Sequence, residues 1–138
     1  MNTDNHVGFT IGGDITAISR IKALLDDYPD RFKNFAFSSR ERKYCDKQTY
    51  PAQHYAARWA VKEAYVKAIG EIGANPNLST IEIVRRPTPH VSLSDDGLEL
   101  LHNAAGSRGV PVEHTEIAIT LSHEKNLNLA LGIVLIKF

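Results

Sequence analysis

The chain has 138 residues, of which 43% are hydrophobic and 23% charged, and its sixteen Lys and Arg side chains balance sixteen Asp and Glu. This composition predicts one domain spanning residues 1–138 and excludes a disordered, collagen-like or disulfide-rich chain. A net charge of zero also argues against a general nucleic-acid binder.

Neither end of the chain suggests export or membrane insertion. The first ten residues lack the basic start and apolar run of a signal peptide, and no stretch reaches the roughly 18 apolar residues of a membrane span. Cys45 is the single cysteine and cannot form an internal disulfide. We therefore expect a cytoplasmic protein that does not contact the membrane.

The charges are unevenly distributed along the chain. Residues 20–67 carry eleven basic and six acidic side chains, so this segment has a net charge of +5 and the remainder −5. Such a segment could face an acidic partner or phosphate groups. A set of solvated helix faces would explain the same counts.

The first 50 residues predict a strand followed by short helices. Residues 7–15 form an apolar, β-rich run that is expected to end at Gly12-Gly13-Asp14, which places Asp14 at a strand-to-helix corner. Apolar residues at helical spacing then predict a helix over 16–28, capped by Thr16. Pro29 begins a turn or broken helix, and Ser38 with Glu41 forms a capping box that opens a helix to about residue 47.

The longest predicted helix covers 49–70, with Pro51 in its first turn and Gly70 at its end. Its five alanines allow another element to approach closely. Two short strands follow over 80–86 and 89–93, then a helix over 94–109 and a hairpin over 115–138. These elements predict an α+β domain with a mostly antiparallel sheet.

Glu63 is the unusual residue of the long helix. At about 100° per residue it shares a face with Ala56, Trp59, Ala60 and Val66. Because burying a lone charge costs several kcal/mol, this carboxylate needs a partner, a metal or a partly wet cleft.

Asp14 and Glu63 together offer the oxygen ligands that Mg²⁺ takes, and Lys67 would neutralise phosphate charge beside the metal. Each residue also has an ordinary explanation. Glu63 and Lys67 could form an i,i+4 surface ion pair, and Asp14 could be a cap or turn residue. His123 is more often a hydrogen-bonded turn histidine than a ligand.

Other catalytic and binding signatures are lacking. The remaining histidines show no zinc spacing, and they are His6, His54, His90, His102 and His114. The sequence has no GxGxxG, Walker or GxSxG motif, and Cys45 has no local nucleophile signature.

Four segments carry a family resemblance: "IGGDITAISRI", "FAFSSRERKYC", "PAQHYAARWAVKEAYVKAIG" and "ITLSHEKNLNLALGIVL". In this order, from about Ile11 to Ile136, they resemble the holo-acyl-carrier-protein synthase family of phosphopantetheinyl transferases. The resemblance implies the 4'-phosphopantetheinyl transferase fold. It also implies Mg²⁺-dependent transfer of the phosphopantetheine arm of coenzyme A to a serine of an apo acyl carrier protein, with release of adenosine 3',5'-bisphosphate.

The resemblance assigns roles to the acidic and phosphate-binding residues. Asp14 and Glu63 match the family's magnesium ligands, and Lys67 matches the lysine that contacts the coenzyme A phosphates near the metal. His123 of "LSH" matches a late histidine near the coenzyme's phosphates. A metal-associated water, or a carboxylate acting through one, would accept the serine proton.

The resemblance also assigns partner contacts. Arg20 matches the arginine that meets the acidic recognition helix of the carrier protein, and Arg58 and Lys62 are expected to contact the coenzyme. The family's short form is a trimer with active sites between subunits, so a homotrimer is expected. The acceptor could serve fatty-acid, polyketide or another pathway.

The chain departs from the family pattern in two places. Residues 69–77 replace the usual Gly-Thr-Gly type loop, and the segment 86–90 keeps Pro89 but loses the glycine before it. Two alternatives therefore stay open: a carrier-protein binder of this family without transferase activity, and another Mg²⁺-dependent phosphate-ester enzyme that shares only the fold.

Overall fold

The structure is a computed structural model that describes residues 8–71 and 73–138. Its strands and helices, in chain order, are β1 (Phe9–Ala17), α1 (Ile18–Asp27), α2 (Pro29–Ala36), α3 (Ser39–Asp46), α4 (Pro51–Ile69), β2 (Ile81–Val84), β3 (His90–Leu93), α5 (Asp95–Ser107), β4 (Glu116–Glu124) and β5 (Leu129–Lys137). The predicted α+β class is confirmed. Among these helices, none has the length and apolarity to cross a membrane.

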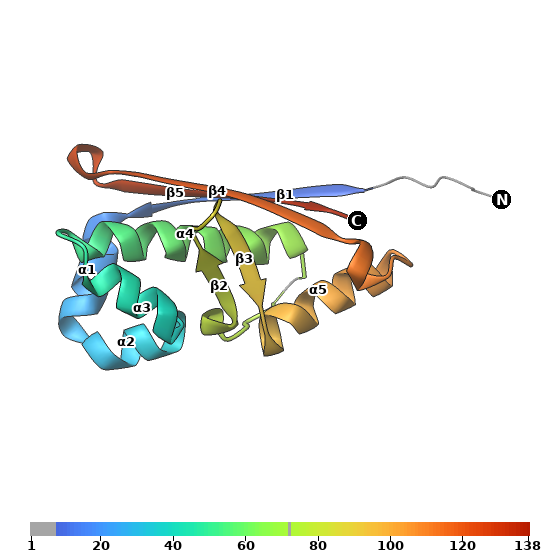
Figure 1. The fold of residues 1–138 in the computed structure, drawn as a ribbon, viewed down its shortest axis with the longest axis horizontal. Helices are drawn as coiled ribbons and strands as arrows, with labels where there is room; N and C mark the ends of the chain where they lie inside the picture. Colours follow the sequence, from blue (N-terminus) through green and yellow to red (C-terminus); the bar gives the residue numbers. More distant parts are fainter. Residues whose placement is uncertain (1–7, 72) are drawn as a thin grey trace.

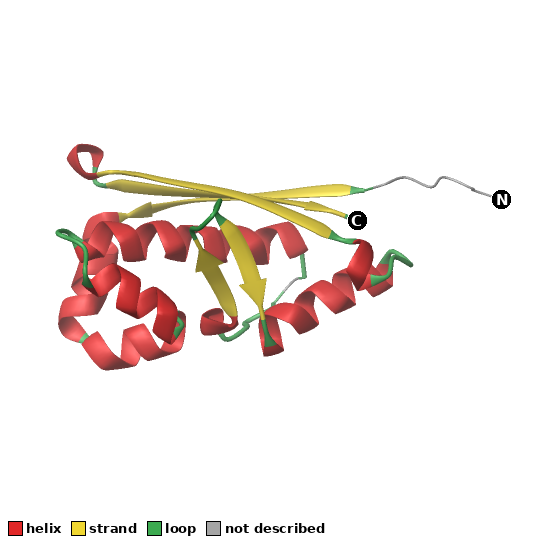
Figure 2. Ribbon diagram, viewed as in Figure 1, coloured by secondary structure: helices red, strands yellow, loops and turns green. Residues whose placement is uncertain are grey.

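A three-stranded antiparallel sheet of order β1-β5-β4 forms one layer, and α4 runs along one of its faces (Figures 1 and 2). The register places Asp14 of β1 opposite Gly132 of β5, which in turn lies opposite Leu121 of β4. Helices α1, α2 and α3 gather at one end of α4, while α5 lies at the other end (Figure 1). The hairpin of β2 and β3 is a separate two-stranded sheet.

Two glycines of the sheet let α4 approach its backbone. A Cβ at Gly12 would lie 1.9 Å from the carbonyl oxygen of Ala64, and one at Gly132 would lie 2.4 Å from the amide nitrogen of Val61. The facing helix positions include Ala60 and Ala64, which are fully buried. The alanine-rich sequence correctly predicted this close approach, which permits dense packing without large side chains.

A buried ion pair joins α3, α4 and β2. Lys62 is fully buried, and its Nζ donates to Glu41 Oε1 at 2.7 Å and to the carbonyl oxygens of Leu78 and Ile81, each at 2.8 Å. The other carboxylate oxygen of Glu41 accepts from the amide of Ile83. Burial lowers the pKa of Lys62, and the Glu41 carboxylate opposes that effect. Each charge is thus paired inside the protein.

The capping and end signals of two helices are confirmed. Ser38 and Glu41 form the predicted capping box of α3. Pro51 occupies the first turn of α4, and Gly70 ends the helix at φ 74°, a left-handed conformation that glycine adopts without steric cost. Ser94 occupies the N-cap position of α5, although its side chain makes no capping hydrogen bond.

The predicted corner at Asp14 is wrong. Strand β1 continues through Asp14 to Ala17, because its pairing with β5 extends that far. Thr16 does not cap α1; its hydroxyl donates to Asp14 Oδ2 at 2.6 Å. Gly12 serves the contact with α4 rather than a turn, so Asp14 is held inside a regular sheet.

The face of the sheet that points away from α4 is apolar and exposed. Alternation along β1 and β5 brings several large hydrophobic side chains to this face, among them Phe9, Ile11, Ile15, Leu129 and Leu135. Ile11 and Ile15 are 70% and 68% exposed. Contiguous apolar surface of this kind marks an interaction site.

Candidate active site

Asp14 and Lys67 meet where β1 passes α4. Lys67 Nζ donates to Asp14 Oδ1 at 3.0 Å and to the carbonyl oxygen of Gly13 at 3.1 Å. The second oxygen of Asp14 accepts from Thr16. The Asp14 side chain is 16% exposed, whereas that of Lys67 is 55% exposed. The ammonium group therefore borders the solvent while the carboxylate lies at the base of the site.

Glu63 lies one helical turn before Lys67 and is half-buried. Burial raises the pKa of Glu63, and the nearby Asp14 carboxylate raises it further, while Lys67 and Arg20 act in the opposite direction. These four residues therefore share one electrostatic environment. Within the described parts of the chain, Lys67 forms its ion pair with Asp14 and not with Glu63, so the alternative of a simple i,i+4 surface pair is wrong.

The donor set at this place fits a magnesium ion. The two carboxylates supply hard oxygen ligands, and a bound cation would oppose the burial and the Asp14 repulsion that together raise the pKa of Glu63. Mg²⁺ keeps several waters and binds one or two protein carboxylates together with substrate phosphates. Residues 8–71 and 73–138 contain no group of three acidic, histidine or cysteine side chains that could enclose a metal, so an open, phosphate-completed site is the type that fits.

A second group of polar side chains lies on the opposite side of α4. We call it the basic cluster; its members are Tyr44, His54, Arg58, Arg85 and His123. The His54 and His123 rings are 5.0 Å apart between centroids. The guanidinium of Arg58 stacks 4.5 Å from the centre of the Tyr44 ring, and Arg85 Nη1 donates to the Tyr44 hydroxyl at 2.6 Å.

Both imidazoles of the basic cluster favour the neutral form. Burial, His123 and the two arginines lower the pKa of His54 to about 4. Burial and the same two arginines lower the pKa of His123, although Glu124 opposes them. The cluster is therefore electropositive at neutral pH through its guanidinium groups, which favours an anionic ligand.

Helix geometry separates the two sites. Glu63 and Lys67 are spaced i,i+4 on one flank of α4, and His54 and Arg58 are spaced i,i+4 on another. At about 100° per residue, Arg58 and Glu63 point about 140° apart. Asp14 and His123 come from the two outer strands of the sheet, which β5 separates. The structure thus brings Asp14, Glu63, Lys67 and Arg20 together and places His123 and Arg58 elsewhere.

Lys62 belongs to neither site. All three of its N–H donors are used inside the protein, by Glu41 and two carbonyl groups, so the expected coenzyme contact has no free donor in this structure. The physical reason is that Lys62 faces away from the sheet, where α3 and β2 cover the helix.

Arg20 is exposed on α1, one turn before Leu24. Leu24 begins a shallow groove of about 430 Å³ that is also lined by Tyr28, Arg31, Phe32 and Phe35. Tyr28 and Phe35 are more than half exposed. The surface beside Arg20 therefore combines basic and aromatic side chains.

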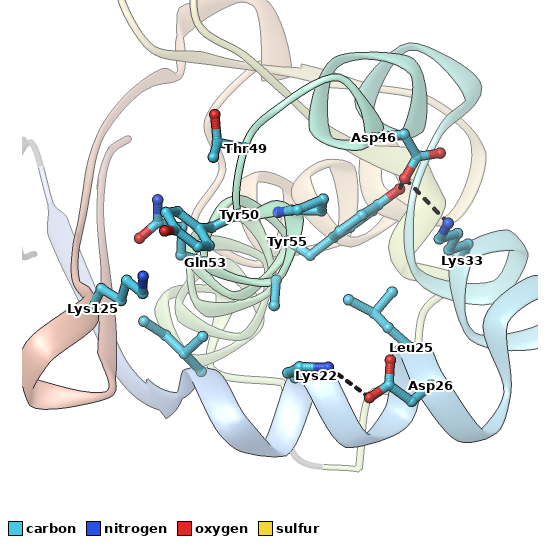
Figure 3. Close-up of a pocket in the computed structure, with 13 residues that line it drawn as sticks. Lys22, Leu25, Asp26, Lys33, Asp46, Thr49, Tyr50, Gln53, Tyr55 and Lys125 are labelled. Carbon is cyan, nitrogen blue, oxygen red and sulfur yellow. Dashed lines mark hydrogen bonds and ion pairs between the residues drawn. The ribbon is translucent and has the colours of Figure 1, made fainter.

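A different cleft, of about 630 Å³, opens between α1, α2 and the start of α4 (Figure 3). Five of its polar side chains are paired with one another: Lys22 with Asp26, and both Tyr55 and Lys33 with Asp46. Both carboxylates that line this larger cleft are therefore already engaged.

Sequence comparisons identify the class of protein to which this fold and site belong. Residues 10–126 match the 4'-phosphopantetheinyl transferase superfamily. The holo-[acyl-carrier-protein] synthase of Syntrophus aciditrophicus is 35% identical over 83% of this chain and 86% of its own length. That of Chlamydia muridarum is 35% identical over 91% of this chain and 93% of its own.

Structural comparison agrees with the sequence matches. The structure of an ACPS-CoA complex from Chronobacterium ammoniagenes superposes with a TM-score of 0.76 at 25% identity, covering 95% of this chain and 98% of that one. The chain belongs to the 4'-phosphopantetheinyl transferase superfamily and, within it, to the holo-[acyl-carrier-protein] synthase family.

Sequence reasoning missed three members of the basic cluster, namely Tyr44, His54 and Arg85. The signal for His54 was available, because it lies one turn before Arg58 on the same helix flank. Tyr44 and Arg85 reach the cluster only through the packing of α3 and the β2–β3 hairpin against α4, which no local pattern encodes.

Proposed function

We propose that this protein is a holo-[acyl-carrier-protein] synthase in which Asp14 and Glu63 hold Mg²⁺ for phosphopantetheine transfer from coenzyme A to a carrier-protein serine. The observation that carries the proposal is the convergence of Asp14, Glu63 and Lys67 from β1 and α4 in a chain of this family. We further propose that residues 1–138 act as one domain in the cytoplasm.

Asp14, Glu63 and Lys67, which we call the carboxylate site, would position a pyrophosphate. Bound Mg²⁺ would offset phosphate charge as the bond from serine oxygen to the β-phosphorus forms and the bond to the departing adenosine bisphosphate breaks. Lys67 presents its exposed ammonium at the solvent side of the two carboxylates, where it would bind a phosphate oxygen. Thr16 and Gly13 hold Asp14 and Lys67 in place through hydrogen bonds.

A homotrimer with active sites between subunits accounts for two features of the single chain. The carboxylate site and the basic cluster lie on opposite flanks of α4, so one coenzyme molecule would reach both only if a neighbouring copy supplied one of them. The exposed apolar face of the β1-β5-β4 sheet gives such copies a surface to bury. Arg58 and His123 would then contact coenzyme phosphates from the neighbouring subunit.

The carrier protein would dock on α1 beside the carboxylate site. Arg20 lies close enough to Glu63 to lower its pKa, so a partner bound at Arg20 would present its serine near the metal. Acidic carrier proteins complement this surface, and the aromatic groove next to Arg20 supplies apolar contact area.

Intact-mass analysis of an apo acyl carrier protein tests the function directly. Incubation with this protein, coenzyme A and Mg²⁺ is expected to add one phosphopantetheine to the carrier. A chelator and Glu63→Gln should each prevent the addition. A folded sample that binds coenzyme A yet modifies none of several carrier proteins would contradict transfer and indicate a non-catalytic binder.

A further inference from the structure

We propose that Asn128, in the turn between β4 and β5, is a positioning residue for carrier-protein binding, which fixes the start of α1 and thereby the place of Arg20. This inference rests on the proposed function, because it takes Arg20 as the docking residue. It adds a residue that the sequence did not indicate and that touches neither the carrier protein nor coenzyme A.

Helix α1 begins without the usual local stabilisation of a helix start. Its N-cap residue is Ala17, whose side chain cannot accept a hydrogen bond, and its first turn contains no acidic residue. Arg20 lies in that first turn, where a positive charge opposes the helix dipole. The first amide groups of α1 therefore need acceptors from elsewhere in the chain.

Asn128 supplies these acceptors from the other end of the sequence. Its carbonyl oxygen accepts from the amide of Ile18 at 3.0 Å, and its Oδ1 accepts from the amide of Ser19 at 2.8 Å. Its Nδ2 donates to Ser19 Oγ at 2.9 Å. Figure 1 shows the β4–β5 turn at the same end of the molecule as α1. One residue thus performs the role of an N-cap, although 109 positions separate it from Ser19.

The backbone of Asn128 is itself held in place. It has φ 56° and ψ 34°, a left-handed conformation that asparagine and glycine adopt more readily than other residues. The amide of Asn128 donates to the carbonyl oxygen of Lys125, and the next residue, Leu129, pairs with Ala17 in the sheet. The sheet therefore fixes Asn128, and Asn128 fixes the first turn of α1.

This contact bears on docking because Arg20 directly follows Ser19. Arg20 lies close enough to Glu63 to lower its pKa, so a carrier protein bound at Arg20 would keep its serine near the metal only while α1 starts at this place. Among the described residues, Asn128 forms its hydrogen bonds with α1 and with its own turn. The residues that we assign to coenzyme A lie on α4 and β4. Loss of the contact should therefore affect the carrier protein and spare the coenzyme.

Steady-state kinetics with each substrate varied in turn test this difference. Asn128→Gly removes both side-chain hydrogen bonds, and glycine tolerates the left-handed backbone. This variant should raise KM for the carrier protein by about threefold or more and change KM for coenzyme A by less than about twofold. Asn128→Asp keeps an oxygen that can accept from the Ser19 amide, so it should restore most of the wild-type KM.

Asn126→Gly is the matched control for Asn128→Gly. It changes the same residue type in the same turn, where Asn126 is exposed and its amide donates to the side chain of Glu124, a bond that glycine can also form. Both KM values should remain those of the wild type. A rise in the carrier KM with Asn126→Gly as large as that with Asn128→Gly would overturn the specific role of Asn128.

A double-mutant cycle shows whether Asn128 acts through Arg20. In an Arg20→Ala background, Asn128→Gly should have little further effect on KM for the carrier protein, because the charge that it positions is absent. An undiminished effect in that background would show a general structural loss and overturn the inference.

Direct binding separates this inference from the proposed function. The Kd for an apo acyl carrier protein is measured without coenzyme A, so it reports on docking even in a sample that transfers nothing, which would contradict the proposed function alone. Asn128→Gly should bind the carrier about threefold more weakly than the wild type and Asn126→Gly equally well. Equal Kd values for Asn128→Gly and the wild type, or no carrier binding by the folded wild type, would overturn the inference.

Discussion

The two flanks of α4 are built alike but carry opposite chemistry. Each presents a pair of side chains spaced i,i+4, Glu63 with Lys67 on one flank and His54 with Arg58 on the other. On the first flank, burial and then repulsion by the Asp14 carboxylate raise the pKa of Glu63. On the second, burial and then the clustered arginines lower the pKa of His54 and His123. We propose that the first flank binds a cation and the second an anion.

In the proposed trimer, this contrast would let each chain supply part of a site that a neighbouring copy completes. A helix separates the two charge sets, so neither neutralises the other within one chain. Each therefore keeps an unsatisfied charge that a metal, a phosphate or a neighbouring copy can satisfy. Four predictions test this division, in order of expected effect.

Lys62 tests whether the side of α4 that α3 and β2 cover is purely structural. Lys62→Met should lower the free energy of unfolding by about 3–5 kcal/mol, because it leaves the Glu41 carboxylate buried without its partner. Urea denaturation measures the change. Lys22→Met is the control, because the Lys22–Asp26 pair is exposed and its loss should cost about 0.5 kcal/mol or less. A wild-type midpoint in Lys62→Met combined with weaker coenzyme binding would instead assign Lys62 to the substrate.

Glu63 tests the cation-binding flank. Glu63→Gln should lower kcat/KM for transfer by about 100-fold or more, because a neutral amide loses the ligand charge while keeping the shape of the side chain. Circular dichroism should show an unchanged fold. Glu71→Gln, an exposed change just beyond the end of α4, should be active. Near-normal activity of Glu63→Gln would remove this residue from the metal site.

Arg20 tests whether the carrier protein approaches the same flank. Arg20→Ala should raise KM for the carrier protein by about three- to tenfold at low salt and leave KM for coenzyme A nearly unchanged, because an exposed charge mainly steers association. The difference should shrink as ionic strength rises. Equal changes in both KM values would show that Arg20 does not distinguish the two substrates.

His54 tests the anion-binding flank through pH. Its pKa is about 4 in the folded protein, below the ordinary value of 6.5, chiefly because the ring is partly buried. Between these values the unfolded chain binds more protons, so His54 makes stability fall as pH drops through this range. His54→Phe should remove that part of the loss. Its melting temperature should fall about 3 °C less than that of the wild type between pH 7 and pH 4.5. Parallel curves would show that His54 is not held neutral.

The sequence predicted the grouping of Asp14, Glu63 and Lys67 better than that of the basic cluster, for a physical reason. Glu63 and Lys67 lie on one helix among alanines, so their unusual placement is visible from spacing alone, and Asp14 joins them through the family pattern. Tyr44 and Arg85 join Arg58 only when three elements pack. Packing of α3 and β2 against α4 also buried Lys62, and pairing with β5 extended β1 through Asp14. Local periodicity encodes neither outcome.

The glycine at position 12 links the packing of α4 to the chemistry of the site. It lies two residues before Asp14 on the same face of β1, directly beneath the turn of α4 that follows Glu63. Because Gly12 has no side chain, α4 can lie close to β1, and this keeps the two carboxylates near each other. Even one methyl group there would lift the helix from the strand and widen the gap across which Asp14 and Glu63 must share one ion. Gly12, which has no functional group, thus helps to set the distance between the Asp14 and Glu63 carboxylates.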